Sequence, residues 1–135
     1  MSLDLAKVNV AALSEKGYEF ELKLPEVNTP TGAFIKVRGA SSDTVLKYQK
    51  RAFNEQQIKE NQAKKKNRPL DPMMIEDYDD ASIDSAIVRT IGWRGITDGG
   101  VDVEFTSENA KDIYSKHPWI RFAVITESDT MGNFL

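Results

Sequence analysis

The stretch YEFELKLPEVNTPTGAFIKV, residues 18–37, carries the clearest structural pattern in the chain. Phe20, Leu22 and Leu24 alternate with charged residues, which is the period of a strand with one buried face. Two prolines, an asparagine and a glycine then predict a turn. A second apolar run, residues 33–37, follows the turn. The stretch therefore predicts a β-hairpin near the N-terminus.

Helical patterns begin directly after this hairpin. Ser41 or Ser42 can cap a polar helix over residues 43–66 by accepting a hydrogen bond from its first free N–H groups. The first turns of this helix place apolar side chains on one face, but the sequence beyond Ile58 has almost nothing to bury. We therefore expect the helix to project outward or to fray before prolines end it. The residues expected on the apolar face are Val45, Leu46, Gln49 and Phe53, and the prolines are Pro69 and Pro72.

The rest of the chain continues as mainly helical sequence. An apolar stripe behind an acidic start predicts a helix from about residue 74 to 93. In VDVEF, residues 101–105, apolar residues alternate with charged ones, so this segment could form a third short strand. Thr106 can cap a helix that ends at Lys116, and Pro118 suits the first position of a last helix. The expected fold class is α+β, with a small N-terminal hairpin and about four helices.

Length and composition indicate a globular protein. A chain of 135 residues suits a single domain over residues 1–135, and we expect flexible ends at 1–15 and 128–135. The net charge of −3 gives no bulk electrostatic reason to bind nucleic acid. The absence of cysteine excludes disulfides and thiolate metal sites. No signal peptide or membrane-spanning segment is visible, so we expect the protein in the cytosol.

The glycine-rich stretch GWRGITDGG, residues 92–100, raises the question of a phosphate-binding loop. Gly95 and Gly100 have the separation of the two glycines in a Walker loop, but the lysine that must follow is missing. We interpret the stretch as structural. Gly92 or Gly95 would end the preceding helix, and Asp98 with Gly99 would form a tight turn.

The other candidate chemical motifs are incomplete. EDYDDASID, residues 76–84, lacks the glycine that an EF-hand calcium loop requires. His117 is the only histidine, and no nucleophile elbow accompanies it. No pair of carboxylates stands out. We therefore predict no catalytic residue, no metal ligand and no cofactor, and we do not expect an enzyme.

Two groups of residues are instead candidates for partner contacts. A basic run ends the polar helix and could bind nucleic-acid phosphates or an acidic protein surface, such as EDYDD of a second copy. Apolar residues at the C-terminus must either dock onto the domain or meet a partner. The candidates are Lys64, Lys65, Lys66, Arg68, Phe134 and Leu135.

The large apolar residues of the second half are the candidates for the structural core. The two tryptophans are expected to fill the space between the second and the last helix, with apolar residues of both helices around them. The predicted core residues are Trp93, Trp119, Ile87, Ile91 and Phe122.

The second half also carries a series of short motifs in a characteristic order. It resembles the tail assembly chaperones of long-tailed bacteriophages, and the first half is similar to them in layout. The matching motifs run from a Gly-Trp pair to a terminal Asn-Phe. They are Gly92-Trp93; Gly95-Ile96 with Asp98-Gly99; Val103 and Phe105; Thr106 with Glu108, Asn109 and Ala110; Pro118-Trp119-Ile120; and Asn133-Phe134.

This resemblance implies a non-enzymatic assembly factor of the infected cell. Such a protein acts in the host cytoplasm and is not part of the mature virion. It would self-associate, bind and solubilise the tape measure protein, and help to recruit tail tube protein. On physical grounds we expect helix 43–66 and the C-terminal segment to be the contact elements. The alternative that the residues leave open is a small nucleic-acid-binding regulator that uses the basic run 64–68.

Overall fold

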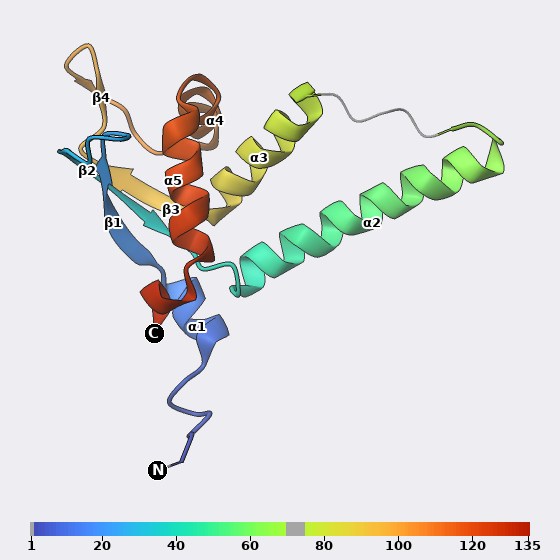
Figure 1. Ribbon diagram of the computed structural model, residues 1–135, viewed down its shortest axis with the longest axis horizontal. Coiled ribbons are helices and arrows are strands. Elements are labelled where there is room, and N and C mark those ends of the chain that lie inside the picture. The colour runs from blue at the N-terminus through green and yellow to red at the C-terminus, as the bar shows by residue number, and fades with distance from the viewer. Residues whose placement is uncertain (1, 70–74) are drawn as a thin grey trace.

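The computed structural model describes residues 2–69 and 75–135, and it has the expected α+β architecture (Figure 1). The described residues form five α-helices, a three-stranded antiparallel sheet, a two-stranded hairpin and one 3₁₀ helix. Pro72 and Met74, the expected helix boundaries, lie outside the described residues. The elements are α1 Val10–Lys16, β1 Tyr18–Lys23, β2 Pro30–Val37, α2 Asp43–Lys65, α3 Ile75–Arg89, β3 Thr90–Arg94, β4 Thr97–Asp98, β5 Val101–Asp102, α4 Ser107–Lys116, α5 Pro118–Asp129 and η1 Met131–Phe134.

The predicted N-terminal hairpin is confirmed as β1 and β2. The two strands pair antiparallel, with Phe20 opposite Ile35, and the inward side chains of both strands are buried. Asn28 takes a left-handed conformation in the connecting turn, which asparagine tolerates better than most residues. β2 becomes the central strand because β3 pairs along its other edge.

The helix expected over residues 74–93 is shorter than predicted. It ends at Arg89, and the following residues form β3, so neither Gly92 nor Gly95 ends a helix. The hydroxyl of Thr90 donates to the carbonyl of Ala86, and the chain then turns into the ladder with β2. Residues 90–94 fit the helical period equally well in sequence. Pairing with β2 decides in favour of a strand.

The glycine-rich stretch contains a tight turn, as predicted, but the turn is displaced by one residue. Gly99 and Gly100 both have positive φ and join the two-residue strands β4 and β5, as a tight hairpin turn requires. A Cβ on Gly95 would lie 2.5 Å from the carbonyl oxygen of Gly32, so this glycine allows β3 to approach β2 closely. Only Val101 and Asp102 of the expected third strand are extended, and they pair with β4 rather than with the main sheet.

The core lies between the sheet and helices α3, α4 and α5. Helix α5 contacts β1 and β2, and α3 and α4 pack against α5 and against each other. Ile35 and Val37 of the central strand are fully buried beside Val124 and Tyr114. The Tyr114 hydroxyl lies 2.6 Å from the hydroxyl of Thr90, and burial raises the pKa of Tyr114 to about 12. This tyrosine therefore stays protonated at neutral pH.

The predicted core residues have two different outcomes. Ile87, Trp93 and Trp119 are partly buried against the core, and Trp93 stacks edge-on against Phe105 of the following loop and Tyr114 of α4. Ile91 is partly buried but does not belong to this cluster. The prediction that Phe122 belongs to the core is wrong, because 56% of this residue is exposed. The buried face of α5 instead consists of Ile120, Arg121, Val124 and Ser128.

The two chain ends contain more regular structure than expected. Residues 10–16 within the predicted flexible N-terminus form α1, and residues 131–134 of the predicted C-terminal tail form η1, which contacts α1. This turn places Phe134 edge-on against Tyr18, with ring centroids 6.1 Å apart. Phe134 is only 5% exposed, so it docks onto the domain instead of meeting a partner.

Candidate functional site

Helix α2 projects from the body because only its first turns are held there. The Ser42 hydroxyl accepts the N–H of Val45, which confirms Ser42 as the capping residue, and the Glu15 carboxylate accepts the N–H of Thr44 at 2.7 Å. Val45 is the one buried residue of α2. The carboxylate of Glu15 is favourable at the positive end of this helix. Its hydrogen bond with Thr44, more than its proximity to Arg38, lowers the pKa of Glu15.

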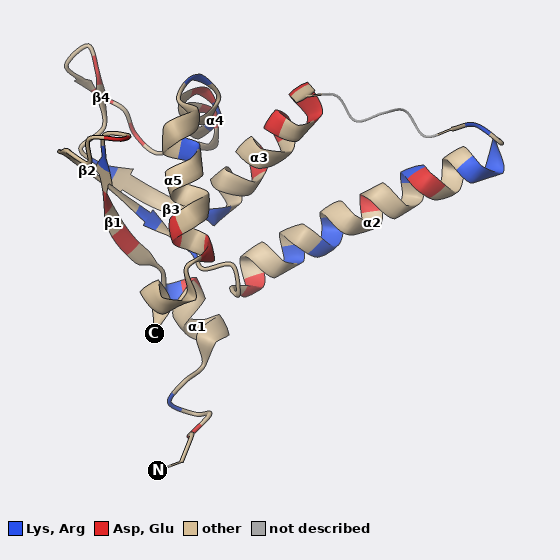
Figure 2. Ribbon diagram, in the orientation of Figure 1, with Lys and Arg blue, Asp and Glu red and all other residues tan. Residues whose placement is uncertain are grey.

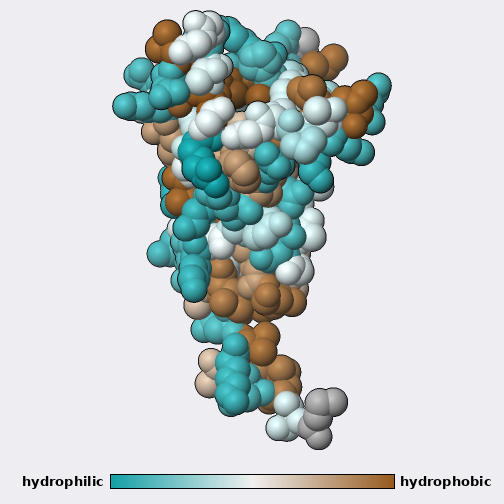
Figure 3. Space-filling view, turned by 90° about the vertical axis from the view of Figure 1, so that its left-hand side faces the viewer, coloured by the Kyte–Doolittle hydropathy of each residue, from teal (hydrophilic) through white to brown (hydrophobic). Residues whose placement is uncertain are grey.

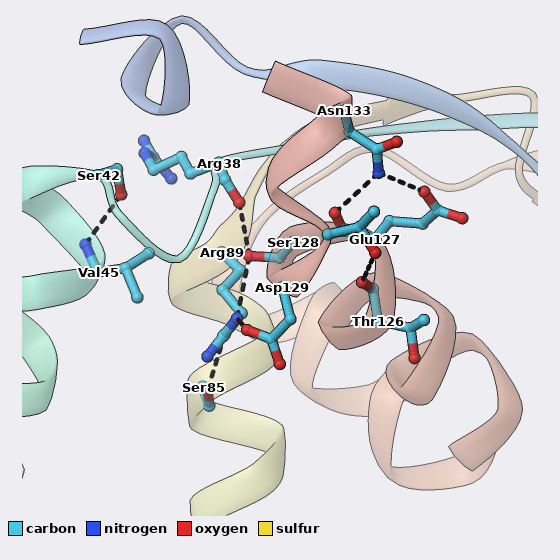
Figure 4. Close-up of polar contacts among 11 residues, drawn as sticks. Arg38, Ser42, Val45, Ser85, Arg89, Thr126, Glu127, Ser128, Asp129 and Asn133 are labelled. Atoms are coloured by element: carbon cyan, nitrogen blue, oxygen red, sulfur yellow. Dashed lines mark hydrogen bonds and ion pairs between the residues drawn. The ribbon is translucent and has the colours of Figure 1, made fainter. Parts of the chain in front are cut away.

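A buried polar junction holds the end of α3 against α5 and against Arg38, the residue that follows β2 (Figure 4). The guanidinium of Arg89 donates to the hydroxyls of Ser85 and Ser128 and pairs with the Asp129 carboxylate at 2.6 Å. The Ser128 hydroxyl in turn donates to the carbonyl of Arg38 at 2.6 Å. The far part of α2 lacks such an anchor, whereas Asp79 of α3 lies 3.6 Å from Arg121 of α5. The two helices diverge from one another as a V (Figure 1).

The space between α2 and α3 forms an open cleft with a volume of about 980 Å³. Its α2 wall extends from Tyr48 to Lys66, and its α3 wall carries Asp80 and Asp84. Tyr48 lies at the narrow end. Its pKa is raised by burial and, to a smaller extent, by the charge of Asp84 across the cleft.

The α3 wall of this cleft is acidic, whereas the α2 wall carries Lys59 and Lys66 against the single acidic residue Glu55, and the two helices differ in charge as a whole (Figure 2). Helix α2 contains six lysines or arginines and three acidic residues, whereas α3 contains five acidic residues and one arginine. Within the described residues, Lys59 and Lys66 on the first wall form no ion pair with Asp80 or Asp84 on the second. The cleft therefore presents unneutralised charges of both signs to an occupant.

The predicted contact residues do not form one site. Lys66 and Arg68 line the cleft, whereas Lys64 and Lys65 are exposed outside its lining. Leu135 is 70% exposed at the opposite end of the molecule, and Phe134 is buried.

An apolar pair on α2, outside the cleft, is a second candidate surface. Leu46 is 41% exposed and Phe53 is 62% exposed, although the sequence pattern places both on the buried face of this helix. They are seven residues apart and so lie on the same side of α2. Neither lines the cleft. The seven-residue spacing of Leu46 and Phe53 was visible in the sequence. Only the structure shows that no part of the described chain covers these two side chains.

Apolar residues are also exposed where the two termini lie. Figure 3 shows hydrophobic surface at the end of the body from which the N-terminal segment extends. Leu3 and Leu5 of this segment and Met131 and Leu135 near the C-terminus are exposed. Leu3 and Leu5 precede α1, Met131 begins η1 and Leu135 follows it, and both chain ends lie far from the open end of the cleft (Figure 1).

The described residues contain no group of three or more histidine, cysteine, aspartate or glutamate side chains placed to hold a metal ion. Among the same residues, no helix has the length and apolar character needed to cross a membrane. Comparison of the chain with known protein families, with curated proteins and with solved structures finds no match.

Proposed function

We propose that this protein is a bacteriophage tail assembly chaperone without enzymatic activity. It binds the tape measure protein, keeps this long helical client soluble in the host cytoplasm, and helps to recruit tail tube protein during tail assembly. It self-associates and is not part of the mature virion. The proposal rests on the ordered motifs between Gly92 and Phe134 and on the surface that α2 presents.

The structural observation that supports this proposal is the exposed face of α2 that points away from the cleft. A helix of 23 residues with one buried residue gains little stability from its own domain, so a partner must supply its packing. Leu46 and Phe53 provide apolar anchors on one side of this helix. Amphipathic helices commonly dock onto a partner through anchors at such intervals. We therefore assign the first contact with the client to this pair.

The acidic wall of the cleft argues against the nucleic-acid alternative. Lys66 and Arg68 face a cleft whose other wall carries Asp80 and Asp84. A phosphate backbone bound there would be repelled by these carboxylates. Lys64 and Lys65 remain accessible, so nucleic-acid binding stays a prediction that a salt-dependence measurement can test.

Co-expression with a tape measure protein from the same phage genome tests the chaperone proposal. The wild-type chain is expected to move the client from the insoluble to the soluble fraction and to co-elute with it. The double variant Leu46→Ser/Phe53→Ser should retain the fold, because both side chains are exposed, but should lose most of the soluble client.

Val27→Ser is the matched control, since Val27 is also exposed but lies in the β1–β2 turn. It should solubilise the client as the wild type does. A client that stays insoluble with the wild type contradicts the function. Equal rescue by the double variant and the wild type contradicts the assigned surface.

A further inference from the structure

The cleft face of α2 has the spacing of a coiled-coil seam. Its residues recur at alternating intervals of four and three, which keeps them on one line along a helix that pairs with another. All of them line the cleft, and most are polar. The seam consists of Tyr48, Ala52, Glu55, Lys59 and Gln62 of α2 and of Lys66, the residue that follows the helix.

This seam is complementary to itself when two copies run antiparallel. If the two-fold axis lies beside Gln57, Glu55 of each copy faces Lys59 of the other. This register gives two ion pairs that are related by the two-fold axis. The remaining positions pair in the same register: Tyr48 with Lys66, a cation–π combination, and Ala52 with Gln62. No seam position is left facing a like charge.

We propose that α2 of a second copy occupies the α2/α3 cleft. The two α2 helices pair antiparallel through their seams, and each copy receives the helix of the other. The acidic wall then lies beside a helix rich in lysine and arginine, because Asp80 and Asp84 of one copy flank α2 of its partner. The arrangement supplies the packing that α2 lacks and neutralises both walls at once.

The cleft is not closed within one copy, because among the described residues Lys59 and Lys66 form no ion pair with Asp80 or Asp84. The junction at Arg89 fixes the end of α3 to α5, and the buried Val45 fixes the start of α2, so both helices are anchored at the end where they converge. The open volume of about 980 Å³ leaves room for part of an added helix, which is about 10 Å wide. The pairing uses the cleft face and leaves Leu46 and Phe53 free for a client.

Charge reversal in the seam tests this pairing by sedimentation velocity at low ionic strength over a concentration series. Glu55→Lys and Lys59→Glu each turn both central ion pairs into like-charge contacts, and each should raise the dissociation constant about tenfold or more. An equimolar mixture of the two variants should associate again, because each copy then faces the opposite charge. The double variant Glu55→Lys/Lys59→Glu should associate as the wild type does.

Lys50→Glu is the control, since it changes the net charge of α2 equally but lies outside the cleft lining. It should leave association nearly unchanged. Circular dichroism should show the same helicity for all variants, because both seam residues are exposed.

Recovery on mixing is the decisive result, since closure within one copy cannot respond to a second protein. A wild type that stays monomeric, single variants that associate like the wild type, or a mixture that does not recover would each overturn the proposal. The inference rests on the self-association included in the proposed function. Its test needs no client, so its failure is distinguishable from a failure to solubilise the tape measure protein.

Discussion

Adjacent residues of α5 show that chemical type alone does not decide burial. Arg121 is buried, donating to the carbonyl of Tyr114 at 3.3 Å and lying 3.6 Å from the Asp79 carboxylate. Phe122 is exposed, and the Arg121 guanidinium lies 5.0 Å from its ring centroid. The helical period predicted an apolar stripe through Phe122. The available partners of Arg121 instead set the rotation of the helix.

Ser128 supports the junction on which α3 and α5 meet. Its buried hydroxyl accepts from Arg89 and donates to the Arg38 carbonyl, so Ser128→Ala leaves both groups with one partner fewer. We expect the free energy of unfolding to fall by about 1–3 kcal/mol, measured by urea denaturation.

Ser115→Ala is the control, because this hydroxyl is exposed and donates only to the carbonyl of Lys111. Its effect should stay within about 0.5 kcal/mol. Equal losses in the two variants would show that the buried hydroxyl adds nothing to the junction.

At the scale of elements, the caps were readable from sequence and one boundary was not. Ser42 and Thr106 each accept a hydrogen bond in the first turn of their helices, as predicted, since these contacts involve residues close in the chain. The boundary between α3 and β3 depends on β2, which lies about fifty residues earlier. A local pattern cannot contain that information.

The start of α2 has a pH dependence that comes from Glu15. Its carboxylate accepts the Thr44 N–H, and its pKa in the folded chain lies below the ordinary value of 4.5. The ionised form therefore stabilises the fold fully above pH 4.5, and this contribution is lost as the pH falls through the lower, folded pKa. Glu15→Gln should cost about 0.3–1 kcal/mol at neutral pH and almost nothing near pH 2.

Urea denaturation at both pH values measures the difference between the wild type and Glu15→Gln. Glu104→Gln, at an exposed loop position, is the control and should show little effect at either pH. A difference for Glu15→Gln that persists unchanged in acid would contradict a role of the ionised carboxylate.

At the scale of the whole molecule, the outer part of α2 is the least supported element. Val45 near its start is buried, but residues 49–59 are all exposed, so most of the helix lacks tertiary packing. A helix in that situation is marginally stable in water. Hydrogen exchange at high dilution should therefore be faster in residues 53–65 than in α5.

Protection of the same α2 amides should increase with protein concentration, because association buries the helix. Lys59→Glu should reduce this increase. Protection of α2 equal to that of α5 at every dilution would contradict the view that α2 depends on a partner.

The sequence by itself determined the fold class, the N-terminal hairpin, the polar helix 43–65 and the caps, because alternation, helical period and capping depend on nearby residues. It also placed opposite charges on the two consecutive helices that form the cleft. Only the tertiary structure decided that Thr90–Arg94 joins β2, that Phe134 is buried while Phe122 is exposed, and that the two helices diverge. Each of these outcomes depends on contacts between residues far apart in the chain, and the local pattern does not encode them.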